Sequence, residues 1–312
     1  MDTIRGTTTR RGLANLINAL IGLLSSFTRT NGNIFFVNNS ALGVALGAAD
    51  DASASRGRTA NKPFLTVDYA IGRCTASRGD KIIVGEGHVE TLTGAAAVAL
   101  DVAGVSIEGM GVGRSRPRFN YTTAIGASLN VTAANCRISN CVFTMIGFDA
   151  ITAGINVSAA DFVLDDCEVE FADATNQAVL ALLTASGADR MWLKDCWFHG
   201  SADAGTATAI RIAAGKDIRI ERCVIWGNFT STLGGIDNSA AVVNLNVNNC
   251  KIANNTASAA KAIACHASTT GDLSDNIYRV LTGTAPVAMA AGYGSGRSYY
   301  TAAAGVAAGT LI

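Results

Sequence analysis

A repeated eight-residue pattern is the feature that most limits the fold of this 312-residue chain. The pattern is an apolar-x-apolar step, two polar residues, and then Cys-x-apolar. Five copies follow one another every 26 to 29 residues, beginning at Cys136, Phe162, Met191, Ile218 and Leu245. A period of this length is typical of solenoid proteins, in which each repeat is one structural unit stacked on the next.

Each copy predicts two short strands that meet at a corner. Apolar side chains alternate with period two, as in a strand, and the phase of the alternation breaks across the polar pair. A third alternation occurs in the repeats, at Leu129–Val131, Ile155–Val157, Leu180–Leu182, Ile210–Ile212 and Ile263–Cys265. Three strands and three turns in roughly 27 residues make one coil of a parallel β-helix. We therefore expect an all-β solenoid of about seven or more coils.

Stacked coils place equivalent residues above one another, so the repeated cysteines should form one internal column. Its members are Cys141, Cys167, Cys196, Cys223 and Cys250. Neighbouring strands lie about 4.8 Å apart, which exceeds the roughly 3.5–4.5 Å between the Cβ atoms of a disulfide. We expect five reduced, buried thiols that serve as a core ladder. Weaker copies at 105–112 and 271–278 place Met110 and Asn276 at the cysteine position.

The composition fits a folded protein with no general attraction for nucleic acid. Hydrophobic residues make up 49% of the chain, and 24 basic residues balance 24 acidic ones. A nucleic-acid binder usually carries a basic excess, so no nucleic-acid partner is expected. The eight cysteines lack zinc-type CxxC spacing and the three histidines are scattered, so neither a metal nor a cofactor is predicted.

Residues 1–30 predict an amphipathic helical arm. The segment Gly12–Phe27 is too short for a membrane span and lacks a clear small-x-small cleavage site. Its apolar residues recur at intervals of three and four and form one stripe: Leu13, Leu16, Ile17, Leu20, Leu24 and Phe27. The stripe either caps the chain's own core or anchors the protein to a sister subunit or a larger assembly.

Residues 31–92 predict a cap and the first coils. Pro63 suits the first turn of a helix that places Phe64, Val67 and Ile71 on one face, and Gly79-Asp80 introduces an Ile-Ile-Val strand. The β-helix follows at 93–290, and 291–312 form a Gly/Ala/Tyr-rich C-terminal tail.

The runs Pro63–Ile71 and Gly79–Glu90 resemble the opening of pectate-lyase-like right-handed β-helix proteins. Together with the small, Asn/Thr-rich coils, they also resemble β-helix proteins of tailed-phage virions. The resemblance covers about residues 33–290 and implies a right-handed fold. In that group such domains serve as trimeric tail spikes, some of them polysaccharide-cleaving, and as head-decoration proteins. The resemblance thus implies a homotrimer in the virion, with the major capsid protein among its partners.

The sequence predicts no conventional catalytic site. Asp165-Asp166 is the only adjacent acidic pair in the repeats, and it falls at the corner, where Asn and Asp are preferred for conformational reasons. Asp166, Asp195 and Arg222 could gather across coils as in a lyase, but a corner column of alternating charge gives the same pattern. We therefore expect a non-enzymatic head-decoration protein, with a tail spike or fibre, or a polysaccharide-degrading enzyme, as alternatives.

Three tryptophans should point outward on neighbouring coils and form one apolar stripe. Trp192, Trp197 and Trp226 each lie next to an inward-facing residue in a strand. Exposed apolar strips usually mark protein contacts, so subunit packing is the first explanation. Binding of a host-surface glycan is the second.

Overall fold

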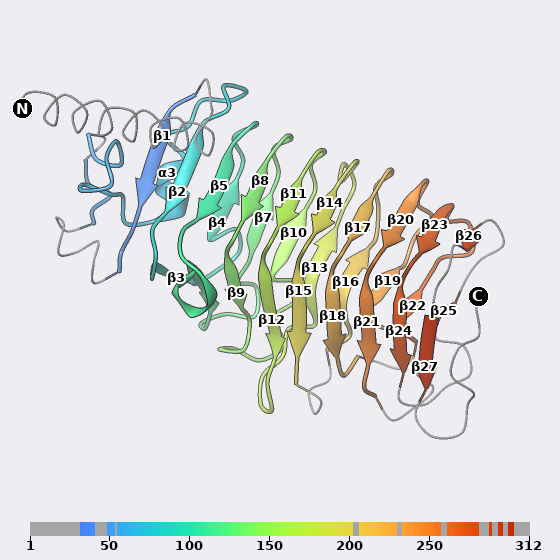
Figure 1. Ribbon diagram of the computed structural model, residues 1–312. Coiled ribbons are helices and arrows are strands. Elements are labelled where there is room, and N and C mark those ends of the chain that lie inside the picture. Colours follow the sequence, from blue (N-terminus) through green and yellow to red (C-terminus); the bar gives the residue numbers. More distant parts are fainter. Residues whose placement is uncertain are drawn as a thin grey trace, which may run out of the picture.

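Three long parallel sheets run side by side along the molecule in the computed structural model (Figure 1). The structure describes residues 32–40, 49–53, 55–201, 206–229, 233–256, 261–280, 287–288, 293–295 and 299–302. Each strand pairs in parallel with the equivalent strands of the preceding and following coils, as β11 (Val163–Asp165) does with β8 (Arg137–Ser139) and β14 (Trp192–Lys194). The prediction of an all-β parallel solenoid of about seven coils is confirmed.

We call the three sheets A, B and C and give the strands of each in chain order. Sheet A contains β1 (Ile34–Val37), β2 (Lys81–Val84), β5 (Ser106–Gly109), β8 (Arg137–Ser139), β11 (Val163–Asp165), β14 (Trp192–Lys194), β17 (Arg219–Glu221), β20 (Leu245–Asn248), β23 (Gly271–Ser274) and β26 (Tyr293–Ser295). Sheet B contains β3 (Val89–Leu92), β6 (Arg118–Tyr121), β9 (Val142–Thr144), β12 (Glu168–Ala172), β15 (Trp197–Gly200), β18 (Val224–Gly227), β21 (Lys251–Asn254), β24 (Ile277–Val280) and β27 (Tyr299–Ala302). Sheet C contains β4 (Val98–Leu100), β7 (Leu129–Val131), β10 (Ile155–Val157), β13 (Leu180–Thr184), β16 (Thr208–Ile212), β19 (Ile236–Asn238), β22 (Ile263–Ala264) and β25 (Val287–Ala288).

The polar pair of each repeat forms the sharp corner between sheets A and B. Its second residue has a positive φ of 49° to 56° in five successive coils, at Asn140, Asp166, Asp195, Arg222 and Asn249. Asn and Asp tolerate this left-handed conformation better than other residues with a Cβ atom. The corner therefore explains why polar residues recur at this place in the repeat.

One coil departs from the predicted repeat. Met110, expected at the cysteine position, is 50% exposed. The short 3-10 helix η1 (Gly113–Ser115) is inserted after it, and Arg118 rather than Gly111 pairs with Val142. The prediction for Met110 is wrong because the inserted turn displaces it from the corner. Asn276, by contrast, is fully buried, and its side-chain oxygen accepts the Cys250 N–H at 2.8 Å.

The opening of the solenoid is capped by a short helix, α3 (Val67–Ile71). Thr66 caps its N-terminus by accepting the Tyr69 N–H, so Pro63 lies before the helix and not in its first turn as predicted. Phe64 forms a bridge with Val37 instead, and its side chain is buried together with Val67 and Ile71. Phe64, Val67 and Ile71 thus cover the apolar core at the N-terminal end of the solenoid.

The solenoid continues into the segment expected to be a C-terminal tail. The predicted arm at 1–30, including its apolar stripe, lies outside the described residues. In the segment expected as a C-terminal tail, β26 and β27 continue sheets A and B. Among the described residues, no helix has the length and apolar character needed to cross a membrane.

Candidate functional site

The outer face of sheet B brings two carboxylates, a histidine and two tryptophans together on three adjacent coils. Alternate residues of a strand point to the same side of a sheet. On β12 these are Glu168 and Glu170, and on β15 they are Trp197 and His199, which pair with them in register. On β18, Trp226 pairs with His199. We call these five residues the sheet B site.

Glu168 is the centre of a polar chain in this site. Its Oε1 lies 3.0 Å from His199 Nε2, and its Oε2 is paired with the guanidinium of Arg116, which reaches in from the inserted turn. A carboxylate that accepts the Nε2–H of a neutral imidazole fixes its tautomer and leaves Nδ1 as the nitrogen able to take up a proton.

The imidazole of His199 lies between two indole rings. Its centroid is 4.0 Å from that of Trp197 and 6.0 Å from that of Trp226, and both pairs are stacked. Trp197 is 43% exposed, which is unusual for so large an apolar side chain. The stacked rings hold the imidazole in one orientation and present an aromatic surface to solvent beside it.

The second carboxylate, Glu170, is less constrained than Glu168. Its nearest cation is Arg118, at 3.9 Å, and Arg118 Nη1 also donates to the Thr144 hydroxyl at 2.8 Å. Glu168 and Glu170 are two residues apart on one strand, which places their Cα atoms about 6.6 Å apart. The site therefore holds one fixed carboxylate and one that can adjust to a ligand.

A shallow hollow of about 200 Å³ continues the sheet B site toward the C-terminal coils. It is lined by Trp226 on one side and by Lys251 and Arg279 on the other. No described residue forms an ion pair with Lys251 or Arg279. The face thus changes from carboxylates and histidine to an aromatic wall and then to two cations, over successive coils.

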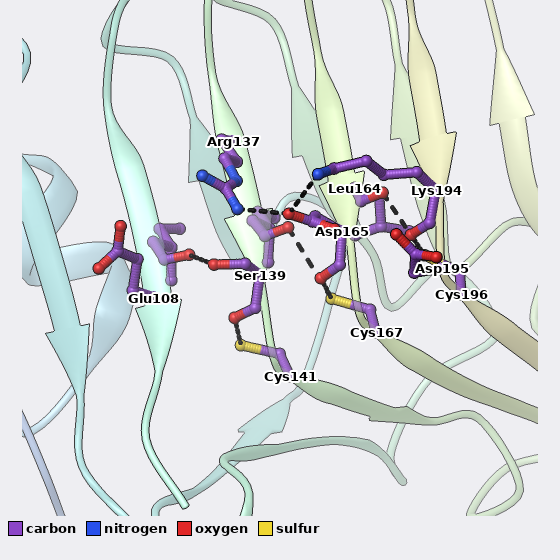
Figure 2. A network of polar contacts seen from close by, with 12 residues as sticks. Glu108, Arg137, Ser139, Cys141, Leu164, Asp165, Cys167, Lys194, Asp195 and Cys196 are labelled. Carbon is purple, nitrogen blue, oxygen red and sulfur yellow. Dashed lines mark hydrogen bonds and ion pairs between the residues drawn. The ribbon is translucent and has the colours of Figure 1, made fainter. Parts of the chain in front are cut away.

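Sheet A carries a polar network of a different kind, in which the charges neutralise one another (Figure 2). Asp165 is paired with Arg137 on one coil and with Lys194 on the next, the latter at 3.0 Å, and Lys81 pairs with Glu108 at 2.8 Å. Asp165 is almost fully buried. Its partners compensate the charge, so this network stabilises the stacking of coils and offers no free acid or base.

Two of the corner residues considered as a lyase-like group, Asp195 and Arg222, pair with each other. Arg222 donates two hydrogen bonds of 2.7 Å to Asp195, and these bonds hold the pKa of that carboxyl below its usual range. No group of three or more potential metal ligands occurs among the described residues. The positive φ of Asp166, Asp195 and Arg222 and the pairing of Arg222 with Asp195 fit a structural role at the corner.

One acidic group on sheet C has a pKa shifted in the opposite direction. Burial raises the pKa of Asp237, although Arg211 lies 2.9 Å away and lowers it. Asp237 is only 4% exposed. Its carboxylate is therefore screened from any large ligand in this arrangement.

The single tryptophan stripe predicted from the sequence does not form. Trp197 and Trp226 share the outer face of sheet B, whereas Trp192 lies on β14 of sheet A, around the corner. The ammonium group of Lys194 lies over the Trp192 ring, 5.0 Å from its centroid. The polar pair of the corner separates Trp192 from Trp197, so residues close in sequence occupy different faces.

The cysteines of the repeat point inward, next to the corner (Figure 2). Cys141, Cys167, Cys196, Cys223 and Cys250 are buried and free. Their thiols lie near backbone carbonyls, as Cys141 does near that of Ser139 at 3.3 Å. Burial raises the pKa of Cys141 to about 12. A thiol in this state is neither a nucleophile nor a metal ligand.

The remaining histidine of interest, His88, belongs to the framework of the first coils. It is fully buried, its Nδ1 accepts the Asn39 N–H at 3.2 Å, and its Nε2 lies 3.2 Å from Glu90. Glu90 in turn accepts the N–H of Val67 at the start of α3. His88 thus ties the cap to the first coil, whereas His199 is the histidine that reaches a surface site.

Sequence reasoning found Trp197 and Trp226 but missed the carboxylates beside them. Glu168 and Glu170 stand one repeat before Trp197 and His199, so the register of the repeat places them side by side. Arg116 could not be found in this way, because it lies in the inserted turn, where the repeat is broken. The outward positions of the aligned repeats were the signal that could have revealed Glu168 and Glu170.

Three parallel sheets wound coil upon coil define the chain as a parallel β-helix protein with a polar and aromatic site on one outer face. A family described as the right handed beta helix region matches residues 124–293, more than half of the chain. The chain belongs to this family, which confirms the right-handed fold. No curated protein matches it.

Several solved structures are similar to this chain. A rhamnogalacturonan lyase has a TM-score of 0.45 at 11% identity, over 80% of this chain and 74% of its own. Pectate lyase Pel9A has a TM-score of 0.46 at 11% identity, over 86% and 79%. A GH136 lacto-N-biosidase from Eubacterium ramulus has a TM-score of 0.40 at 10% identity, over 86% and 67%. At these identities the likeness is one of fold.

These structures correct the expectation of a non-enzymatic protein. The resemblance to pectate-lyase-like proteins was right for the fold, but the structures sharing that fold are named as lyases and a biosidase. The absence of a familiar catalytic motif was a poor reason to exclude activity.

Proposed function

We propose that this protein is a polysaccharide-degrading β-helix enzyme whose active site is the sheet B site. The observation that carries the proposal is the pairing of Glu168 with His199 at 3.0 Å beneath an exposed aromatic surface. An ion pair with only a structural role would not require an exposed aromatic surface beside it. Aromatic rings beside a proton-transferring group are what a sugar polymer requires, because the apolar face of a sugar ring packs on indole while its hydroxyls reach polar side chains.

In this proposal His199 transfers the proton, and Glu168 acts as its positioning residue. With Nε2 held by Glu168, Nδ1 accepts a proton from the substrate or from water. Arg116 pairs with the other oxygen of Glu168, and the carboxylate also stabilises the imidazolium that forms. Glu170 lies beside the pair as the adjustable carboxylate and supplies a second acid or base.

The polymer would lie along the sheet B face, across the coils. Each coil advances by about 4.8 Å, so Lys251 and Arg279 lie two and three coils from His199, at the far end of the hollow. Two cations without described acidic partners favour a glycan with negatively charged groups. Trp226, between His199 and these cations, would support the intervening sugar.

The test is an end-group assay on defined polymers. Purified protein is incubated with pectin-like polyuronates, bacterial capsule preparations and neutral glucans, and the products are assayed for new reducing ends and for unsaturated ends. Turnover of a polymer by the parent chain, lost in His199→Ala, is the expected result. Unsaturated ends would identify elimination and reducing ends alone would identify hydrolysis. Equal turnover by both proteins would remove His199 from the mechanism.

We also propose that the enzyme works as a homotrimeric part of a tailed-phage particle. The supporting observations are the small, Asn/Thr-rich coils and the sequence of residues 1–30, which predicts an apolar stripe that would anchor the chain to other virion proteins. A glycan-acting face suits a tail spike that meets host surface glycan better than head decoration. Copy number per particle tests this placement: a few copies support a spike, and hundreds would support decoration of the head.

A further inference from the structure

A second hollow lies on the opposite side of the corner from the sheet B site, and the proposed function does not use it. It has a volume of about 380 Å³ and is lined by Asp161, Val163, Arg190, Trp192, Asp217 and Arg219. These six residues are three matched pairs from three successive coils. In each pair, one residue lies at the turn before sheet A and the other begins the strand on sheet A.

The backbone beneath this hollow is fixed by hydrogen bonds between coils. Asp161, Arg190 and Asp217 all have positive φ, from 55° to 59°. The N–H of each donates to a carbonyl of the next coil at 2.8 Å, reaching Asp189, Lys216 and Val243. The turn is therefore rigid, and a ligand meets side chains that are already in place.

Three of the charged side chains in the hollow, Asp161, Arg190 and Asp217, are held by hydrogen bonds. Arg190 donates two hydrogen bonds of 2.7 Å to Asp161. Asn244 donates to Asp217 Oδ1 at 2.8 Å, which leaves Oδ2 as an available acceptor. The lining contains two carboxylates and two guanidinium groups, so the hollow has no net charge.

Two further groups in the hollow lack partners. Arg219 is exposed and forms no ion pair with a described residue. The indole N–H of Trp192 is buried and has no acceptor among the described residues. A buried donor without an acceptor is uncommon in folded proteins and calls for an explanation such as a bound ligand or water.

We propose that this hollow is a second saccharide-binding site, specific for a neutral sugar unit. A neutral sugar offers hydroxyl acceptors for Arg219 and for the Trp192 N–H, and hydroxyl donors for Asp217 Oδ2. The Val163 and Trp192 side chains supply the apolar wall that a sugar ring requires. The balanced charges of the lining give an anionic ligand no advantage over a neutral one, in contrast to the cationic end of the sheet B site. The inference stands on the sheet A residues alone and not on catalysis at His199.

Indole proton NMR spectroscopy tests this inference on the full chain. The three tryptophans give three indole N–H signals, and Trp192→Phe identifies the one that belongs to Trp192. Glucose, galactose, mannose and N-acetylglucosamine are titrated to high millimolar concentration, with glucuronate as the acidic counterpart. We expect at least one neutral sugar to shift the Trp192 signal saturably, and more strongly than glucuronate does.

Matched variants make the result specific to the hollow. Asp217→Ala and Arg219→Ala should each weaken the binding at least fivefold, whereas Trp197→Phe on sheet B should leave it unchanged. If Asp217→Ala fails to fold, the exposed Arg219→Ala carries the test. The inference is overturned if no neutral sugar gives a saturable shift, if only glucuronate does, or if both variants bind like the parent. Repeating the titration in His199→Ala separates this outcome from failure of the proposed enzyme.

Discussion

The interior column of cysteines and the outer face of sheet B come from the same repeat, yet they follow opposite rules. Inside, five successive coils repeat one residue type, and every member is buried. Outside, the paired positions on β12, β15 and β18 change from Glu to Trp to Val and from Glu to His to Trp. Repetition is what stacking of coils requires, and departure from repetition is where a site can be built.

The comparison predicts that interior residues carry stability and outer residues carry activity. The core of each coil is a layer of apolar side chains in contact with the layers above and below. Outer side chains of sheet B contact solvent and one another. A substitution in one region should therefore affect one property and leave the other unchanged.

The largest expected effect is on stability, for Ile220→Ala in the core of sheet A. Ile220 is fully buried and stacks between Leu193 and Val247. Removal of such a side chain should lower the free energy of unfolding by about 2–5 kcal/mol, measured by chemical denaturation. Arg219→Ala, the exposed neighbour, should change it by less than about 0.5 kcal/mol. Equal losses in the free energy of unfolding for the two variants would contradict the assignment of stability to the interior residues.

The next effect is on catalysis, for His199→Ala. Loss of a positioned proton-transferring group should reduce kcat by about 10²–10⁴-fold, measured on whichever polymer the parent chain cleaves. The unfolding midpoint should stay close to that of the parent. Glu168→Gln keeps the size of the side chain but removes its charge, and should lower kcat by a smaller factor. A fall in activity that merely follows a fall in stability would contradict a catalytic role.

A smaller effect is expected for Trp197→Ala. The exposed indole stacks on His199 and forms the outer surface of the site. Loss of an aromatic contact of about 0.5–1.5 kcal/mol corresponds to a two- to tenfold rise in KM. Trp192→Ala on sheet A is the matched control and should leave KM for a short oligosaccharide unchanged. The same rise in KM for both variants would mean that the two faces do not act separately.

The smallest effect concerns the pH dependence of stability at the opening of the solenoid. Burial raises the pKa of Asp80, but hydrogen bonds from Arg78 and from the Thr75 and Asn33 N–H groups outweigh it and hold the pKa below its usual value. A lowered pKa stabilises the folded state above the pKa of the unfolded chain, about 3.9, and this contribution disappears as the pH falls further. Asp80→Asn should therefore be less stable than the parent at pH 7, with the difference shrinking below about pH 4. A difference that persists at low pH would assign the effect to packing.

The fold was predictable because one repeat determines it. Apolar alternation, the polar corner and the cysteine period each follow from stacking, and the left-handed corner at Asn140 and Asp166 agrees with the residue types found there. The coil containing Met110 was not predictable, because η1 interrupts the period. The helix start at Val67 was missed, because the helix begins after Thr66 and Pro63 lies outside its first turn.

The candidate site was predictable only in part, for a physical reason. Trp197 and Trp226 are visible as outward residues, but a site depends on which side chains meet across coils. The contact of Glu168 with His199 spans 31 positions in sequence, and that with Arg116 spans 52. Trp192 was grouped with the wrong face because the chain turns a corner between Lys194 and Trp197. Trp192 and Trp197 are therefore close in sequence but lie on different sheets.

The structure of His199→Ala crystallised with an oligosaccharide of the polymer that the parent chain cleaves tests the central claim most directly. The account predicts a sugar chain lying across the coils on sheet B, with one ring packed on Trp197 or Trp226 and a charged group near Lys251 or Arg279. An oligosaccharide bound elsewhere with sheet B empty, or a second copy of the chain packed over Trp197, would contradict it.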